Sequence, residues 1–298
     1  MSRSFRAPGI FTPILTPLDE RGELISETVW DLVDFLARNG VSGLYILGTV
    51  GEGMRLPKET RMKGAEEFVN AVGGKLKTIV QVGSPIPKVS VELAQHAEKI
   101  GADAVASVPP FYYTYDDESV LRYYKLLASS VSIPVIVYNI PVCQGYPLPL
   151  NLIERIFDEV EGVAGIKYTV RDAPGLLKLK ARYGAEKWVA SGYDDMLYHS
   201  TAAGITEHVV GYSNLLPDLE VELYRKVLDG KLEDARKLQL RLDSVIEALS
   251  AFGNLATVLK EALKLKGFNV GVPAEPQHPL KPREREILEN RLRELNLL

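Results

Sequence analysis

The sequence predicts an α/β protein, a (β/α)8 TIM barrel with a C-terminal helical extension. Eight short apolar segments alternate with eight helical patterns between positions 10 and 228, and no Pro/Gly/Ser-rich linker separates them. Such alternation is typical of a parallel sheet covered by helices, and eight regular units favour a closed barrel. The alternative is a doubly wound open sheet, but no Gly-x-Gly-x-x-Gly follows the first strand.

The first four units each pair a short strand with an amphipathic helix. Apolar residues recur at helical spacing after Ser26, at Val29, Leu32, Val33 and Leu36, and Gly40 ends that helix. The four expected strands cover 10–15, 42–49, 78–83 and 104–108, and the helices that follow them cover 26–39, 58–72, 89–101 and 118–129.

The last four units repeat this order. The expected strands cover 134–140, 162–170, 187–195 and 208–214, and the helices cover 151–160, 176–182, 196–204 and 218–228. Two further helical stretches, 232–267 and 282–298, follow the eighth unit. We therefore expect a barrel in 1–230 and, packed on it as part of a single structural unit, C-terminal helices in 231–298.

Composition excludes several classes of function. The chain has 298 residues, of which 46% are hydrophobic and 25% charged, and its net charge is −4. This slightly acidic balance argues against nucleic acid or an anionic membrane as a partner. Cys143 is the single cysteine, so no intrachain disulfide is possible. Pro8 and Pro13 precede any long apolar segment, so we expect no signal peptide and a cytoplasmic protein.

Catalytic groups in such barrels lie at the carboxyl ends of the strands. There the sixth strand carries Lys167 in an apolar run, and burial of a lysine favours the neutral, nucleophilic amine. Thr49, Tyr112 and Tyr138 end other strands at the same mouth. The four histidines lack metal-ligand spacing, so we expect no metal and no cofactor. An amine among hydroxyl groups suits imine chemistry.

Four motifs, GTVGEG, PPFYY, YNIP and GIKYTVRD, occur in an order and spacing that resemble the dihydrodipicolinate synthase / N-acetylneuraminate lyase family of class I aldolases. The resemblance implies that Lys167 forms a Schiff base with a 2-oxo acid and that Tyr138 shuttles protons. It also implies that Thr49 relays between tyrosines and that Tyr112 crosses a subunit interface, with Tyr113 as a rival in the same register.

The resemblance also suggests the substrate-binding positions. Backbone amides at Gly48 and Gly51 approach a carboxylate, whereas Val50 replaces a hydroxyl residue usual in the family. Cys143 stands where dihydrodipicolinate synthases carry an arginine for a dicarboxylic partner. The remaining positions belong to two strand ends that resemble those of sugar-acid aldolases: Gly192, Asp194, Asp195 and Gly211.

We therefore expect a pyruvate-dependent class I aldolase or lyase that cleaves or forms a 2-keto-3-deoxy sugar acid, nearest in pattern to 2-keto-3-deoxygluconate aldolases and neuraminate lyases. Its partners would be pyruvate and an aldehyde. The alternatives are a dihydrodipicolinate synthase, which Cys143 opposes, a Schiff-base dehydratase, and a non-catalytic binding protein. The family also implies a homotetramer built from dimers.

Overall fold

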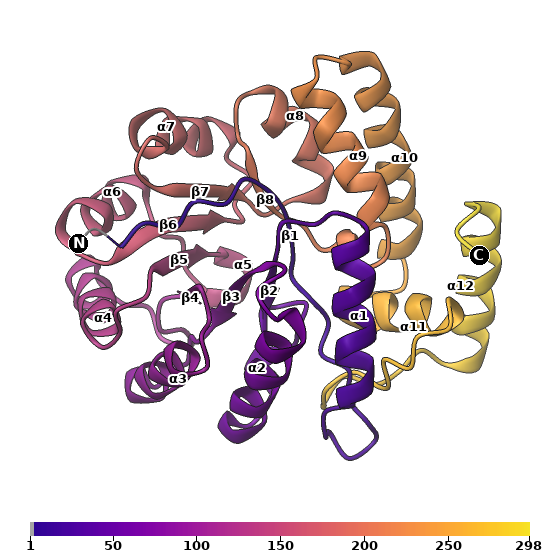
Figure 1. Cartoon of the computed structure of the whole chain (residues 1–298), viewed down its shortest axis with the longest axis horizontal. Coiled ribbons are helices and arrows are strands. Elements are labelled where there is room, and N and C mark those ends of the chain that lie inside the picture. The colour runs from indigo at the N-terminus through magenta and orange to yellow at the C-terminus, as the bar shows by residue number, and fades with distance from the viewer. Residues whose placement is uncertain (1–2) are drawn as a thin grey trace.

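Eight parallel strands close into a barrel in sequence order, which confirms the predicted fold (Figure 1). This computed structural model describes residues 3–298. The barrel closes where Ile10 of the first strand pairs with His208 of the last. The strands are β1 (Gly9–Thr12), β2 (Gly43–Ile46), β3 (Lys77–Gln81), β4 (Ala104–Ser107), β5 (Val135–Asn139), β6 (Val163–Tyr168), β7 (Trp188–Ser191) and β8 (Glu207–Val209).

Helices surround the barrel, and three more follow it toward the C-terminus (Figure 1). The surrounding helices are α1 (Ser26–Arg38), α2 (Lys58–Val72), α3 (Pro87–Lys99), α4 (Asp117–Ser129), α6 (Leu150–Glu159), α7 (Ala173–Tyr183), α8 (Leu197–Ala202) and α9 (Pro217–Leu228). The C-terminal helices are α10 (Leu232–Ser250), α11 (Leu255–Leu265) and α12 (Pro282–Glu294). Short helical turns at the strand ends are η1 (Gly53–Arg55), α5 (Pro141–Gln144), η2 (Asp194–Met196) and η3 (Tyr212–Asn214).

The seventh and eighth strands are shorter than the sequence pattern predicts, because their ends turn across the barrel mouth. β7 stops at Ser191 and β8 at Val209, and the expected continuations become η2 and η3. The Asp194 carboxylate accepts the Tyr212 N–H at 2.6 Å. The Asn214 side chain accepts the Leu15 N–H at 3.0 Å. These bonds hold the turns against neighbouring strand ends and so fix the groups they carry.

Aromatic rings fill the barrel interior in two layers. Phe5, Phe11 and Trp188 pack edge to face at one level, with ring centroids 5.4 Å apart for Phe11 and Trp188. Tyr45 and Tyr138 form an edge-to-face pair at 5.6 Å at a second level. Aromatic pairs in this geometry stabilise by about 0.5–1.5 kcal/mol beyond area burial. The second layer forms the floor of the mouth.

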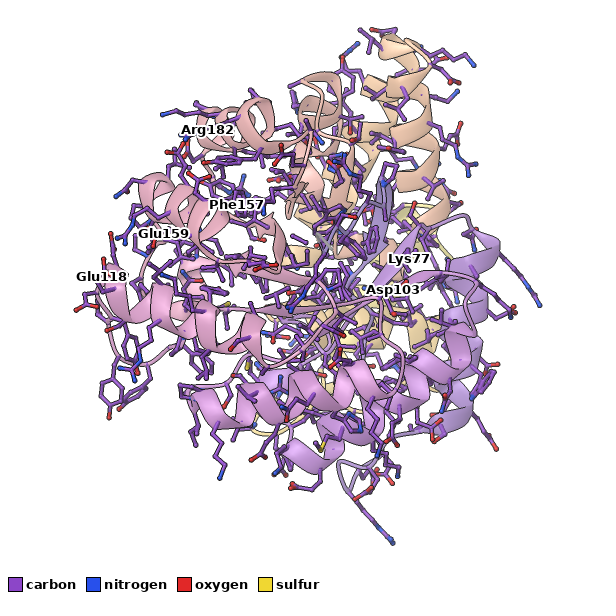
Figure 2. The ribbon with its side chains drawn as sticks, turned by 60° about the vertical axis from the view of Figure 1, so that its left-hand side comes forward. Lys77, Asp103, Glu118, Phe157, Glu159 and Arg182 are labelled. Atoms are coloured by element: carbon purple, nitrogen blue, oxygen red, sulfur yellow. The ribbon has the colours of Figure 1, made fainter. Side chains whose placement is uncertain are left out.

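Ion pairs link helices on the outside of the barrel. Arg155 of α6 bonds Glu118 of α4 at 2.8 Å and Glu159 of its own helix at 2.9 Å; both acids are labelled in Figure 2. Exposed pairs contribute about 0–1 kcal/mol each, so the buried core carries most of the stability.

No single helix within residues 3–298 has the length and apolar composition to cross a membrane. The pair α10 and α11 together reach that threshold, but a bend of 105° separates them.

Candidate active site

Lys167 lies at the centre of the barrel mouth. It is one residue from the end of β6, where it pairs with Tyr138 of β5 and Ala190 of β7. Side chains alternate along a strand, so Lys167 points inward while its neighbours face the helices. The residue is only 4% exposed. The predicted nucleophile is therefore a buried amine rather than a solvated strand end.

Two aromatic rings flank the amine. The Lys167 Nζ lies 4.3 Å from the Tyr45 ring centroid and 4.2 Å from that of Tyr138. Burial lowers the pKa of Lys167 to about 7, while the negative charge of Asp194 acts in the opposite direction. This shift favours the neutral amine near neutral pH far more than in an ordinary lysine, and a neutral amine can attack a carbonyl.

The tyrosine–threonine part of the predicted relay is assembled in this chain. The Tyr138 hydroxyl lies 3.4 Å from Thr49 Oγ1, at the long end of hydrogen-bond distances. Burial raises the pKa of Tyr138 above its ordinary value, so the phenol is protonated at neutral pH. A cation beside the ring stabilises a phenolate, and the Lys167 nitrogen lies at that position, 4.2 Å from the ring centroid.

The two candidate relay tyrosines are exposed, unlike the buried Lys167 and Tyr138. Tyr112 and Tyr113 follow β4, with exposures of 86% and 67%, and their rings stack edge to face on each other. Tyr112 adopts a φ of 82°, a conformation that is rare for a side-chain-bearing residue. Among residues 3–298, neither hydroxyl is hydrogen-bonded to Thr49 or Tyr138.

A buried ion pair anchors the loop that carries Gly48, Val50 and Gly51. Glu52, in a left-handed conformation, forms a 2.7 Å ion pair with Lys260 of α11, and both side chains are fully buried. Its other oxygen accepts from Arg55 and from the Ala274 N–H, each at 3.0 Å. The C-terminal helices therefore hold the loop expected to bind the carboxylate.

The acidic pair after β7 divides between two environments. Asp194 faces the mouth, where a Cβ built on Gly211 would lie 3.9 Å from Asp194 Oδ2 and 3.6 Å from Val50. Asp195 instead forms a 2.7 Å ion pair with Arg171 at the rim. Packing explains why glycine occupies position 192, because a Cβ there would lie 2.0 Å from Thr169 Oγ1. Asp194 is thus the better-placed acceptor for a substrate hydroxyl.

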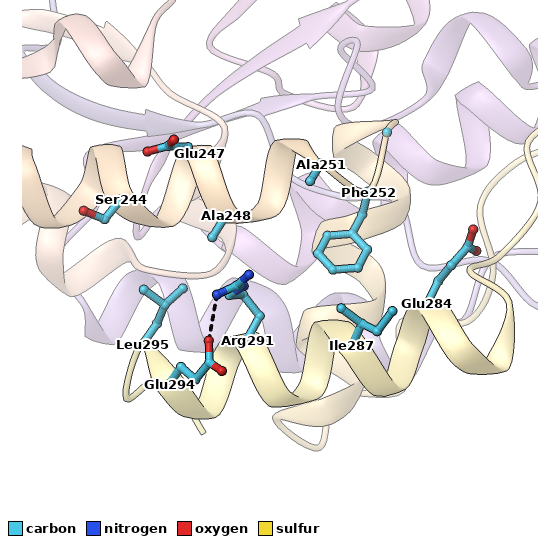
Figure 3. Close-up of a pocket in the computed structure, with 11 residues that line it drawn as sticks. Ser244, Glu247, Ala248, Ala251, Phe252, Glu284, Ile287, Arg291, Glu294 and Leu295 are labelled. Carbon is cyan, nitrogen blue, oxygen red and sulfur yellow. Dashed lines mark hydrogen bonds and ion pairs between the residues drawn. The ribbon is translucent and has the colours of Figure 1, made fainter.

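Cys143 is exposed at the start of the loop after β5 and lines a cavity of about 180 Å³ with Thr49 and Phe111. Burial raises the pKa of its thiol, so the side chain is uncharged at neutral pH. A larger hollow of about 880 Å³ lies between α10 and α12, away from the barrel mouth (Figure 3). Its lining includes Phe252, Ile287 and the Arg291–Glu294 pair, which lack the groups that imine chemistry needs.

Sequence reasoning missed Tyr45 and Lys260. Tyr45 could have been found from strand alternation, because it lies one residue from the end of β2 and its ring points inward. Lys260 gave no signal, since a lysine on an amphipathic helix is usually solvated.

The chain matches the model described as "Dihydrodipicolinate synthetase family" over residues 6–295. A probable 2-dehydro-3-deoxy-D-pentonate aldolase of Escherichia coli (strain K12) is 33% identical over 90% of this chain and 88% of that protein. A 4-hydroxy-tetrahydrodipicolinate synthase of Caldicellulosiruptor bescii is 30% identical over 97% of this chain and 96% of its own. The crystal structure of YagE, a prophage protein of E. coli K12 in complex with pyruvate, has a TM-score of 0.92 at 28% identity and covers 98% of this chain and 99% of its own.

Proposed function

Because this chain belongs to the dihydrodipicolinate synthetase family, we propose that it cleaves or forms a 2-keto-3-deoxy sugar acid through an imine on Lys167, with pyruvate as one product or substrate. Family membership makes the chain an enzyme of the lyase class. The observation that carries the proposal is the buried amine between two aromatic rings, with a pKa of about 7. The pyruvate complex of YagE supports the choice of 2-oxo acid.

In cleavage, the neutral Lys167 amine attacks C2 of the 2-oxo acid, and Tyr138 gives its phenol proton, through Thr49, to the C2 hydroxyl that leaves as water, so that a protonated imine remains. The imine withdraws electrons from the C3–C4 bond while the Tyr138 phenolate accepts the proton of the C4 hydroxyl. The bond breaks, the aldehyde leaves, and C3 of the enamine takes up a proton. Water then hydrolyses the imine and frees pyruvate. The reaction needs no cofactor.

The chemistry of the mouth favours a polyhydroxylated substrate. Cys143 supplies no cation for a second carboxylate, whereas Asp194 supplies an acceptor for hydroxyl groups. Arg171, a cation at the rim, is already paired with Asp195, and Arg55, which lines the cavity beside Cys143, is paired with Glu52. These groups argue against aspartate semialdehyde, the partner that a dihydrodipicolinate synthase would use.

Borohydride reduction in the presence of pyruvate tests the proposal. We expect a mass shift confined to the Lys167 peptide, and Lys187 is the matched control because burial also lowers its pKa. An unmodified Lys167 under turnover conditions would refute the imine. A panel of keto-deoxy acids, with free pyruvate as the readout, then identifies the substrate. Loss of water without pyruvate release would indicate a dehydratase, and condensation with aspartate semialdehyde a synthase.

We also propose a homotetramer built from dimers, as the family implies. The outward position of Tyr112, 86% exposed beside the open mouth, supports its use by a second subunit.

A further inference from the structure

Within residues 3–298, Glu220 of α9 is a fully buried acid that meets no cation and no hydrogen-bond donor. Neither of its carboxyl oxygens has a partner among residues 3–298. Two other buried acids have one: Glu52 contacts Lys260, and Glu261 contacts Lys264. An ionised carboxylate in such surroundings is strongly disfavoured, and the group keeps its proton instead.

The group that faces Glu220 is the carboxyl of Asp194, and each alters the protonation of the other. Two ionised carboxylates cannot hydrogen-bond, because both are acceptors only. A single proton turns this contact into a short, charge-assisted bond. The contact between the two carboxyl groups is therefore favourable only if one of them is protonated.

We propose that Asp194 and Glu220 share one proton, with Glu220 as the positioning residue that holds it, so that a single negative charge faces Lys167. Burial raises the pKa of Asp194, and the Tyr212 N–H, which donates to Asp194 Oδ1 at 2.6 Å, opposes that rise by favouring the ionised form. Glu220 has no such donor, and burial raises its pKa well above the ordinary range. The proton therefore resides on Glu220.

The pair limits the charge that acts on the reactive amine. Asp194 opposes the fall in the pKa of Lys167, and a second charge behind it would oppose that fall further. The titratable groups facing the pair are Tyr212 of η3, whose pKa burial raises, and Lys167 of β6. From α10 the uncharged Gln239 donates to the Asp194 carbonyl at 3.2 Å. A protonated Glu220 thus keeps the amine reactive near neutral pH.

Infrared difference spectroscopy tests for the proton directly. We expect wild type at neutral pH to show the carbonyl band of a protonated carboxyl group, and Glu220→Gln to lack it. Glu222→Gln is the matched control, because Glu222 lies on the same helix but is exposed and paired with Lys226. A spectrum of Glu220→Gln identical to that of wild type would overturn the proposal.

The pH midpoint of borohydride trapping with pyruvate gives a second test, which rests on the proposed imine chemistry. Asp194→Asn removes the charge and should lower the midpoint by about one pH unit. Glu220→Gln mimics the protonated acid and should keep the wild-type midpoint. A midpoint in Glu220→Gln that falls with that of Asp194→Asn would show two charges and overturn the dyad. Absence of any adduct would count against the imine alone, and the infrared result would still decide the dyad.

Discussion

Lys167 loses most of its hydration in the barrel, and this desolvation creates both its reactivity and a cost in stability. Its folded-state pKa of about 7 lies below the ordinary value of 10.5. The unfolded chain therefore binds more protons between these two values, and wild-type stability rises as the pH rises from 7 toward 10.5.

Lys167→Met should consequently be more stable than wild type at neutral pH, by roughly 1–4 kcal/mol, while losing all activity. The difference should shrink as the pH approaches the ordinary lysine pKa. Chemical denaturation at neutral and alkaline pH, at one protein concentration, measures it. Lys187→Met is the control and should destabilise, because Lys187 donates to the Val163 carbonyl at 2.6 Å. A Lys167→Met variant less stable than wild type at pH 7 would contradict this account.

Tyr138→Phe keeps the ring beside Lys167 but removes the hydroxyl that lies 3.4 Å from Thr49. We expect kcat to fall about 10²–10⁴-fold, the range for loss of an acid–base group. Thr49→Val should reproduce part of this fall, and the double variant should show less than the sum of the two effects. Single-turnover kinetics of pyruvate release would measure the rates of the two single variants and of the double variant. Fully additive effects on the rate would exclude a shared relay.

At the scale of elements, periodicity predicted the barrel because strand and helix patterns are local properties of the sequence. The ends of β7 and β8 were predicted too long, since the Asp194–Tyr212 and Leu15–Asn214 bonds that turn them join distant residues. Lys167, Tyr138 and Thr49 were predicted as neighbours because parallel strand ends share one mouth. The neighbours of Glu52 and Glu220 could not be predicted, because Lys260 of α11 and Asp194 of η2 reach these acids only through tertiary packing.

The ion pair between α11 and the Gly48–Gly51 loop should matter for both stability and substrate binding. Lys260→Met leaves Glu52 buried without its lysine, and breaking a buried pair costs about 3–5 kcal/mol. We expect that loss in the free energy of unfolding and a raised KM for pyruvate, because the loop loses its anchor. Lys266→Met, at the exposed C-terminal end of the same helix, should change neither.

Adding Glu52→Gln to Lys260→Met removes the uncompensated charge and should recover part of the stability but not the KM. If KM stays at the wild-type value in both variants, α11 supports the fold without positioning the loop.

At the scale of the whole molecule, the proposed relay is incomplete within a single chain. Thr49 is exposed at the mouth, and Tyr112 projects from the same face with 86% of its surface exposed. Tyr112 has a strained φ of 82° and contacts little of its own chain. Both features are explained if its side chain enters the site of a second copy of the chain. The active unit would then be a dimer in which each mouth receives a tyrosine from its partner.

Mixing two inactive variants tests this arrangement. Lys167→Ala lacks the nucleophile and Tyr112→Phe lacks the donated hydroxyl, so each homo-oligomer should be nearly inactive. In a mixed dimer, the mouth that keeps Lys167 receives an intact Tyr112 from the other subunit, and activity should return after dissociation and reassembly. Tyr113→Phe, treated in the same way, decides between the two neighbouring tyrosines. A Tyr112→Phe enzyme that is inactive alone and is not rescued by Lys167→Ala would place the tyrosine in its own subunit's site, and the oligomer would then serve stability alone.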